Sequence, residues 1–437
     1  MSDWSFKELE KWDKEICKVG RDLGMDWHPI EYEVIDYHEM IGAMAYVGMP
    51  THYRHWSYGK SFERTQTMYN LGMEGLPYEM IINSNPSIAY LMKENPMSTH
   101  LLTMSHCIGH SHFFKNNRMF AETDPDNVIS RFKNAAKRIN KYMADPNIGV
   151  EKVEAALDSC HAIRYQIPRT PGIKRRTLAE QREDLIVRIN RGDAGVDEFD
   201  LARNPIVPEQ NLLLFIRDNC RNMPEWKKDI LTIVERESQY FLPQAYTKIM
   251  NEGLACAGHY KIMNTLKLPQ EYQLAFIKLH NQVVRPHLGR VNPYHLGFHM
   301  LQEIEKRDGW GAVIEACALH NDESFLRRFL DYDICNELNL FSYSFKRQRR
   351  AHTIDSVSSK DGWKSVREAL ITNVGLNSVP VFKVINLGLN DALYLQHEHD
   401  GRDLDIPTAN KVLNHIANLW DGDVMATTIL EGELWEF

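Results

Sequence analysis

Apolar residues recur at helical spacing over much of the first 340 residues. In the first 30 residues they appear every three or four positions among charges, which predicts an amphipathic helix. A second amphipathic helix is predicted from about 33 to 47, before the stop signal Gly48-Met49-Pro50. The stretch 51–62 is aromatic and polar without a clear period, so we predict an ordered loop there.

Two short apolar runs, 80–82 and 88–91, flank a predicted turn at 83–86. A helix is predicted to follow from 98 to 114, and another helical region covers about 125–165. Helical patterning resumes at 211 and runs to about 338, with breaks predicted at Pro224, Pro243, Pro269, Pro286 and Pro293.

The pattern changes in two places. Residues 166–210 are rich in charge, proline and glycine, which predicts an exposed insertion with one short helix at 178–189. A polar, basic stretch that includes the RQRR run at 347–350 predicts a linker region over 341–378. Beyond it, apolar runs around a turn at 388–391, a helix at 407–420 and a strand at 424–429 are expected. The chain is therefore predicted to be mainly α, with a large helical domain over 1–340 and a small α+β domain over 379–437.

Composition narrows the class of protein. The 437 residues are 43% hydrophobic and carry a net charge of −8, which favours a globular core and disfavours broad nucleic-acid binding. No run of about 20 apolar residues is present, so no membrane span is predicted. The seven scattered cysteines include no CxxC pair, and the charged start does not resemble a secretory signal. We expect a cytoplasmic protein.

The most suggestive histidine stretch is His106-Cys107-Ile108-Gly109-His110. On a helix, residues four apart share one face, so His106 and His110 have the spacing of two metal ligands. The glutamate that follows the first histidine in an HExxH peptidase motif is replaced by Cys107. A polar helix face or a buried hydrogen-bonded pair is the alternative interpretation.

A second segment, Asn251-Glu252-Gly253-Leu254-Ala255, resembles the Asn-Glu-Gly-aromatic-Ala segment that supplies the third zinc ligand in gluzincin aminopeptidases. His106, His110 and Glu252 would then form the open two-histidine, one-carboxylate set of a catalytic zinc site, in a zincin-like domain. Iron suits the same residues, so the metal could be zinc or another divalent ion.

Catalytic groups for such a site are less clearly marked. Glu237 precedes Glu252 by about four helical turns and is a candidate base, with Tyr240 as an acid or oxyanion donor. His259 follows Glu252 by two turns and is a candidate ligand or proton shuttle. Support of the metal ligands is the alternative for Glu237 and Tyr240.

The stretch His52–Lys60 combines cations with aromatic rings. Arg54, His55 and Lys60 are candidates to bind a substrate carboxylate, and a structurally fixed loop is the alternative. A further i,i+4 pair, His295 and His299, is interpreted as chance.

Five motifs in order, HWSYGKSF, SHCIGHSHFFKNN, TKIMNEGLACAGH, NPYHLGF and NDESFLRRFL, resemble the stage V sporulation protein R (SpoVR) family. The tail LYLQHEHDGRDLDIPTANKVLNHIANLW resembles that family's C-terminal module, so the likeness runs from about 32 to 424, weakest over 166–210. The matching motif positions are His55, Trp56, Gly59, Lys60, His106, His110, Phe113, Phe114, Asn117, Glu237, Tyr240, Asn251, Glu252, Gly253 and His259. The chain departs from the family pattern at Cys107, His112 and Leu254.

The resemblance implies a cytoplasmic bacterial protein whose sporulating relatives are linked to the peptidoglycan cortex of spores. It also implies relatives encoded beside a serine protein kinase and a von Willebrand-type domain protein. We therefore carry two hypotheses. The first is a zinc-dependent hydrolase of an amide bond, in a peptide or peptidoglycan-type ligand. The second is a non-enzymatic regulatory or scaffolding protein in a kinase-linked stress pathway, and iron-dependent redox chemistry is a third alternative.

Overall fold

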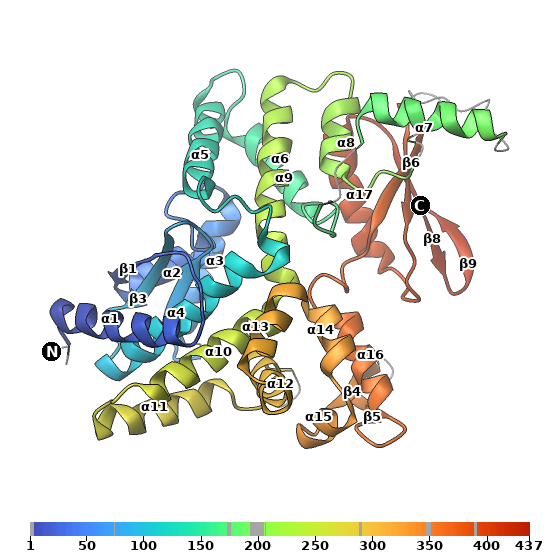
Figure 1. The fold of residues 1–437 in the computed structure, drawn as a ribbon. Helices are drawn as coiled ribbons and strands as arrows, with labels where there is room; N and C mark the ends of the chain where they lie inside the picture. Colours follow the sequence, from blue (N-terminus) through green and yellow to red (C-terminus); the bar gives the residue numbers. More distant parts are fainter. Residues whose placement is uncertain are drawn as a thin grey trace. The chain divides into compact units, whose positions relative to one another are not determined.

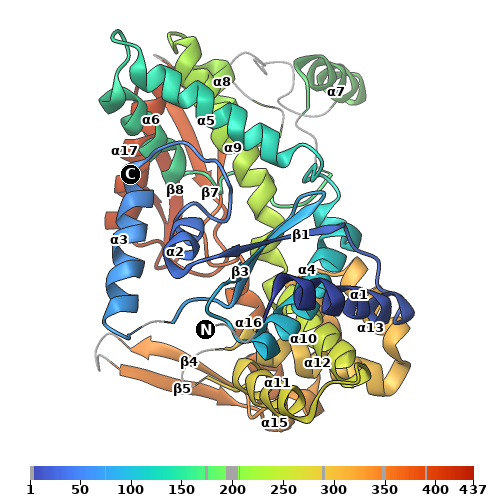
Figure 2. The same ribbon diagram turned by 90° about the vertical axis from the view of Figure 1, so that its left-hand side faces the viewer.

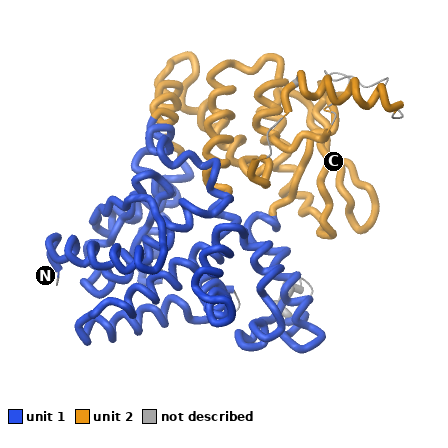
Figure 3. The backbone as a smooth tube through the Cα atoms, in the orientation of Figure 1, with its two compact units in different colours: residues 1–52, 56–133, 243–378 blue, residues 53–55, 134–242, 379–437 orange. Residues whose placement is uncertain are grey.

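The computed structural model describes residues 4–73, 75–172, 176–192, 205, 207–287, 291–346, 351–388 and 391–437. Over these residues the chain is mainly helical and contains three small sheets. The backbone separates into two compact units, each built from segments that are distant in sequence (Figure 3). Unit 1 comprises residues 1–52, 56–133 and 243–378, and unit 2 comprises residues 53–55, 134–242 and 379–437.

Unit 1 is mostly helical, with two short sheets (Figure 1). Its first part contains α1 (Phe6–Asp22), β1 (Ile30–Ile35), α2 (Tyr37–Ala45), α3 (Trp56–Asn70), β2 (Glu79–Ile82), β3 (Ser87–Met92), α4 (Met97–Asn116) and the short 3-10 helix η1 (Arg118–Phe120). Its second part contains α10 (Lys248–Thr265), α11 (Gln270–Val283), α12 (Pro293–Asp308), α13 (Trp310–Leu319), α14 (Asp322–Phe329), α15 (Tyr332–Glu337), β4 (Phe341–Lys346), β5 (Ala351–Val357) and α16 (Trp363–Asn373).

The first sheet has the order β1-β3-β2, with β1 parallel and β2 antiparallel to β3. The predicted turn at 83–86 is confirmed as the β2–β3 connection. The predicted helix at 33–47 is wrong in its first part, where the alternating sequence IEYEVI forms β1 instead. Helix begins only after Asp36, whose side chain accepts a hydrogen bond from the backbone of Glu39 in a capping box.

The loop predicted at 51–62 is also corrected, because α3 begins at Trp56. None of the residues of α3, all of which are described, is buried. A helix that buries no face carries no apolar stripe, so the hydrophobic period that reveals other helices is absent here.

Helix α4 is buried along almost its whole length, and α10 is buried along most of its own. Glycines set how closely these helices approach. A Cβ on Gly109 of α4 would lie 2.5 Å from the Cα of Ala255, and a Cβ on Gly253 would lie 2.6 Å from the backbone of Gly297 in α12. Helices α4, α10 and α12 therefore pack backbone against backbone, which brings their polar side chains together.

The start of α10 is capped by a residue from another helix. The N-cap residue Thr247 makes no side-chain capping bond, but the Asp322 carboxylate accepts hydrogen bonds from the backbone N–H groups of Ile249 (2.9 Å) and Met250 (3.0 Å). Asp322 thus satisfies donors that a helix start leaves unpaired. The first turn of α10, directly before Glu252, is fixed to α14 by these bonds.

Unit 2 combines helices from the middle of the chain with the C-terminal sheet. The chain passes from unit 1 to unit 2 within α5 (Val128–Ala144) and returns to unit 1 within α9 (Glu225–Tyr246). The remaining elements are α6 (Val150–Ala162), α7 (Leu178–Arg191), α8 (Leu212–Asn219), β6 (Phe382–Leu387), β7 (Leu393–His397), α17 (Ile406–Trp420), β8 (Val424–Leu430) and β9 (Glu433–Glu436). The break predicted at Pro243 is wrong, because α9 continues through it.

The C-terminal sheet has the order β6-β7-β8-β9. Strands β6 and β7 are antiparallel, whereas β7 and β8 are parallel and are connected through α17. The predicted small sheet with a helix at 407–420 is confirmed, and β9 adds an edge strand that the apolar pattern did not predict.

The stretch predicted as a linker, 341–378, carries regular structure. Strands β4 and β5 pair antiparallel in a hairpin that Figure 2 shows in side view, and α16 follows them. The RQRR run at 347–350 lies outside the described residues. Within the described ranges, every helix is too short or too polar to cross a lipid bilayer.

Candidate metal centre

Two histidines of α4 present their rings on one face. His106 and His110 lie one helical turn apart, and their ring centroids are 4.6 Å apart. Both residues are buried, with 2% and 7% of their surface exposed. The predicted i,i+4 arrangement on a helix is therefore confirmed.

Glu252 of α10 faces both rings. Its Oε2 lies 3.4 Å from Nε2 of His110 and 3.7 Å from Nε2 of His106. Zinc bonds of about 2.0–2.1 Å at tetrahedral angles place two ligand atoms about 3.3–3.4 Å apart. The two distances to Glu252 are thus close to the separation that one shared ion requires, and one ligand atom from each of the three residues lies within 4.8 Å of the others.

No hydrogen bond uses this carboxylate oxygen. Among the described residues, Oε2 of Glu252 is buried without a hydrogen-bond partner, although two imidazoles face it. Burying such an atom is costly unless something compensates its charge. A cation between Glu252, His106 and His110 would do so.

The outer nitrogens of the two histidines are held in hydrogen bonds. His110 Nδ1 lies 2.8 Å from Oδ1 of Asn251, and His106 Nδ1 lies 2.9 Å from Nδ1 of His259. Asn251 Oδ1 accepts only, so Nδ1 of His110 carries a proton, and Nε2 is the nitrogen that can face an ion. This is the support that metal-binding histidines generally receive.

The hydrogen-bond chain continues beyond His259. Its Nε2 lies 2.7 Å from Nδ1 of His280, and both residues are buried. If Nε2 of His106 faces an ion, its Nδ1–H donates to His259, and His259 in turn donates to His280. One consistent set of neutral tautomers therefore satisfies the whole chain.

The ionisable groups of the centre have pKa values that are shifted in different directions. Burial favours the neutral form of every one of them, but the two neighbouring histidines outweigh burial and hold the pKa of Glu252 well below its ordinary value. Against the effect of burial, Glu252 raises the pKa of His110, whereas burial lowers the pKa of His106 to about 4. Without an ion, the charge of Glu252 therefore favours the protonated form of His110, whereas burial favours the neutral form of His106.

A second carboxylate, Glu79, lies on the other side of His106. It is the first residue of β2, and its Oε1 lies 3.8 Å from Nε2 of His106. Burial raises the pKa of Glu79 to about 7. The Tyr294 ring of α12 is also close, with its centroid 6.3 Å from that of His106, and burial raises the pKa of its phenol.

His106 also belongs to a second candidate group, with Cys256 and His259. All three residues of this group are buried. Its two Nδ1 atoms, 2.9 Å apart, are at hydrogen-bond distance and closer than two ligands of a tetrahedral zinc. Burial also raises the pKa of the Cys256 thiol well above its usual range. The His106–His110–Glu252 group is the better ion site.

Comparison with known proteins places the chain in a family. The family model described as SpoVR like protein matches residues 3–379, and the model of the SpoVR-like C-terminal domain matches residues 381–431. The chain belongs to the SpoVR family. An uncharacterized protein of Escherichia coli (strain K12), YcgB, is 33% identical over 472 aligned residues, which cover 97% of this chain and 92% of that protein. No solved structure gave a significant match.

Two catalytic candidates of this SpoVR-family chain fall in unit 2. Glu237 and Tyr240 lie on α9, whereas Glu252 lies on α10 in unit 1, and the two helices are separate. The helical spacing assumed between Glu237 and Glu252 is therefore wrong. Glu237 accepts a hydrogen bond from the Tyr53 hydroxyl at 3.2 Å, and Tyr240 is 1% exposed. Their catalytic role stays a prediction.

The three candidates for substrate binding are distributed over both units. His55 is buried in unit 2 with its Nε2 3.2 Å from Asp158 Oδ1, and the neighbouring Arg54 is exposed. Lys60 is exposed on α3 in unit 1, with its ammonium 5.7 Å from the ring centroid of Trp56. Binding of a substrate carboxylate by these residues also stays a prediction.

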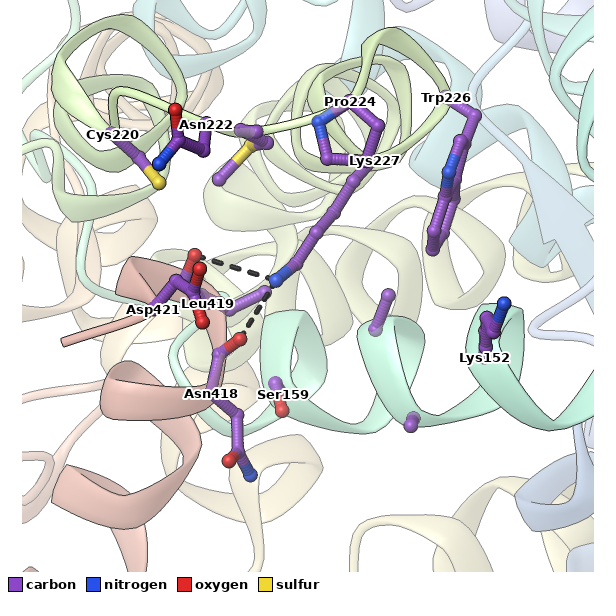
Figure 4. Close-up of a pocket in the computed structure, with 13 residues that line it drawn as sticks. Lys152, Ser159, Cys220, Asn222, Pro224, Trp226, Lys227, Asn418, Leu419 and Asp421 are labelled. Atoms are coloured by element: carbon purple, nitrogen blue, oxygen red, sulfur yellow. Dashed lines mark hydrogen bonds between the residues drawn. The ribbon is translucent and has the colours of Figure 1, made fainter. Parts of the chain in front are cut away.

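A pocket of about 470 Å³ in unit 2 offers little chemistry of its own (Figure 4). The Lys227 ammonium points to the end of α17, where it donates to the carbonyls of Asn418 (2.7 Å) and Leu419 (3.4 Å). This lysine thus stabilises the C-terminus of a helix. Both groups of metal-binding type found among the described residues lie in unit 1.

Sequence reasoning missed Glu79 and His280. Glu79 directly precedes the apolar run 80–82, and a carboxylate at the entry of an apolar strand was a signal that could have marked it. His280 shares no motif with α4 or α10, and only the packing of α11 brings it to His259.

Proposed function

We propose that the His106–His110–Glu252 cluster binds a divalent metal ion, zinc first, and that this SpoVR-family protein hydrolyses an amide bond there. The observation that carries the proposal is the buried Oε2 of Glu252, which has no hydrogen-bond partner among the described residues and faces two Nε2 atoms at 3.4 and 3.7 Å. Two histidines and one carboxylate are a donor set of catalytic zinc sites.

The donor set leaves a coordination position for water or substrate. Structural zinc sites use four protein ligands, whereas catalytic sites use three. Glu252 has 16% of its side chain exposed although its Oε2 is buried, so one edge of the cluster lies at the surface. A bound divalent ion would polarise a carbonyl group and make water acidic near neutral pH.

The roles of the chain's own residues follow from their contacts. Asn251 and His259 hold the two imidazoles with Nε2 toward the ion. Glu252 supplies the negative charge that offsets the charge of a divalent cation. This arrangement is the zincin-like part of the proposal, although the histidines are followed by Cys107 rather than a glutamate.

The proposed substrate is a peptide, of the peptidoglycan type in particular. Support for this class comes from the family's link with the spore cortex, and support for the amide bond comes from the ligand set. A serine protein kinase and a von Willebrand-type domain protein are proposed partners on the same family basis. The alternative, a regulatory scaffold without a catalytic ion, makes an opposite prediction for metal content.

The test is elemental analysis of protein purified without a metal-affinity column. About one zinc per chain is expected in the wild type, with loss in His106→Ala and Glu252→Ala. His299→Ala is the matched control, because His295 and His299 form another i,i+4 pair, on α12, with ring centroids also 4.6 Å apart. The control should retain zinc, and the metal-loaded protein is then assayed on peptidoglycan-derived peptides.

Each outcome distinguishes the hypotheses. Iron with the same dependence on His106 and Glu252 would redirect the search to redox chemistry. Folded wild-type protein without a stoichiometric metal would overturn the enzyme proposal and favour the scaffold. Loss of zinc in His299→Ala alone would place the ion elsewhere.

A further inference from the structure

The cluster as described has ligands but lacks a base on its own helix. In the HExxH arrangement the base follows the first histidine, and here that position is Cys107. Cys107 is 0% exposed. A group that takes a proton from water during hydrolysis must therefore come from another element.

Strand β2 supplies such a group. Glu79 pairs with Leu91 of β3 at the end of the three-stranded sheet, and its Oε1 lies 3.8 Å from Nε2 of His106. Its side chain is 17% exposed, almost the same as the 16% of Glu252. Glu79 thus reaches the same nitrogen as Glu252 from a different element and retains access to solvent.

The Glu79 carboxylate is not occupied elsewhere. Among the described residues, its one recorded polar contact is the 3.8 Å approach to His106. A structural carboxylate of this burial is normally hydrogen-bonded or paired closely. Because neither is present, Glu79 is available to a molecule bound in the cluster.

Glu79 lies too far from the three proposed ligands to share an ion with them. The atoms of His106, His110 and Glu252 all lie within 4.8 Å of one another, and Glu79 does not complete such a set with any two of them. It therefore lies beside the cluster rather than within it. This position suits a group that contacts a water molecule or a substrate at the open coordination position.

We propose that Glu79 is the general acid–base residue of the centre. The inference rests on the proposed function. The Glu79 carboxylate accepts a proton from the attacking water as the water oxygen bonds to the amide carbonyl carbon. When the C–N bond breaks, the same proton passes to the leaving nitrogen, so one water is consumed and Glu79 returns to its starting state.

The first test needs no substrate. Acetohydroxamic acid loses a proton when it chelates a metal ion through two oxygens as acetohydroxamate, so a neighbouring base that takes up this proton strengthens its binding. We expect Glu79→Gln to bind zinc within about threefold of the wild-type affinity and to bind acetohydroxamate at least tenfold more weakly. Glu79→Asp should fall between the two. Glu33→Gln, an exposed carboxylate on β1 of the same sheet, should behave as the wild type.

Two results would overturn the assignment. A loss of zinc affinity of tenfold or more in Glu79→Gln would make Glu79 a ligand. Unchanged acetohydroxamate affinity in a zinc-loaded Glu79→Gln protein would show that no proton passes to it. Both differ from failure of the proposed function, which appears as absent zinc in the wild type itself.

Hydrolysis gives the second test. On any peptide that the wild type cleaves, Glu79→Gln should lower kcat by about 10²–10⁴ with little change in KM, as expected for loss of a proton-transfer group. A matching rise in KM with unchanged kcat would instead make Glu79 a substrate-binding residue and overturn the proposal.

Discussion

Two clusters of histidines and carboxylates, one in each unit, differ in how their polar atoms are partnered. In unit 2, the Tyr53 hydroxyl lies 2.9 Å from Nε2 of His161 and donates to Glu237 at 3.2 Å. The neighbouring His55 lies 3.2 Å from the Asp158 carboxylate. In this cluster, the Tyr53 hydroxyl lies between the histidine and the glutamate and links them at hydrogen-bond distances.

The unit 1 cluster is arranged differently. Its outer nitrogens are hydrogen-bonded, but the inner Nε2 atoms of His106 and His110 face the Glu252 carboxylate at 3.7 and 3.4 Å without a hydrogen bond to its Oε2. Residue types alone do not distinguish the two clusters, since both combine histidine with glutamate or aspartate. In an ion site, the basic atoms of several side chains point to one common position. In a hydrogen-bonded network, they point to donors on the neighbouring side chains.

The largest expected effect comes from the glycines that make this convergence possible. We expect Gly253→Ala to lower the free energy of unfolding by about 3 kcal/mol, at the upper end of the cost of overpacking. The new Cβ would meet the rigid backbone of Gly297 at 2.6 Å, so no side chain can move aside to relieve the contact. The gain in helix propensity, about 1 kcal/mol at most, is too small to offset this. Chemical denaturation measures the change.

The matched control is Gly59→Ala on α3. A Cβ at Gly59 meets nothing within 4 Å, so the same substitution should be neutral or stabilise by about 0.5–1 kcal/mol. Equal stability of the two variants would show that α10 and α12 do not need the close approach. The close packing of these helices would then not explain why the side chains of the unit 1 cluster meet.

The second expected effect separates the two clusters directly. Zinc at 100 times its dissociation constant should raise the free energy of unfolding of the metal-free protein by about 2.7 kcal/mol, because it binds the folded state. This gain should vanish in Glu252→Gln and persist in Glu237→Gln. Thermal unfolding with and without zinc measures it. A gain that is lost in Glu237→Gln and kept in Glu252→Gln would move the ion to unit 2.

These effects also show where sequence reasoning succeeds. The helix that carries His106 and His110, the β2–β3 turn and the C-terminal sheet with its helix follow from local periodicity and turn residues. The pairing of Glu252 with the two histidines was predicted from a short motif. The sequence signals for these features each lie within a short stretch of the chain.

Features that depend on distant segments could not be predicted in this way. Pro243 lies within a helix, and α3 has no buried face, so the usual break and period signals misled there. Glu79 meets His106 because the β1-β3-β2 sheet lies beside α4, and no local pattern records that contact. The division into units likewise joins segments far apart in sequence.

The smallest expected effect concerns His259, which contacts a ligand rather than the ion. Its Nδ1 lies 2.9 Å from Nδ1 of His106 and would accept from it when His106 binds an ion, and its Nε2 faces His280. His259→Asn keeps a polar atom near the position of Nδ1, whereas His259→Gln keeps one near the position of Nε2. We expect zinc affinity close to the wild type in His259→Asn and about tenfold weaker in His259→Gln, at the lower end of the cost of losing such support.

This asymmetry tests what holds the ligand in place. If His259 only fills space, the two variants should bind zinc equally, or the larger glutamine should bind better. If His259 fixes the tautomer of His106, only the variant that restores the acceptor for Nδ1–H should retain the affinity. Isothermal titration with zinc, together with ¹⁵N NMR of the histidine side chains, measures both the affinity and the protonated nitrogen of His106. If the two variants differ in zinc affinity but His106 keeps the same tautomer in both, His259 acts only through packing. The histidines of the unit 1 cluster would then not be oriented for an ion by hydrogen bonds, and this cluster would be closer in kind to the unit 2 cluster.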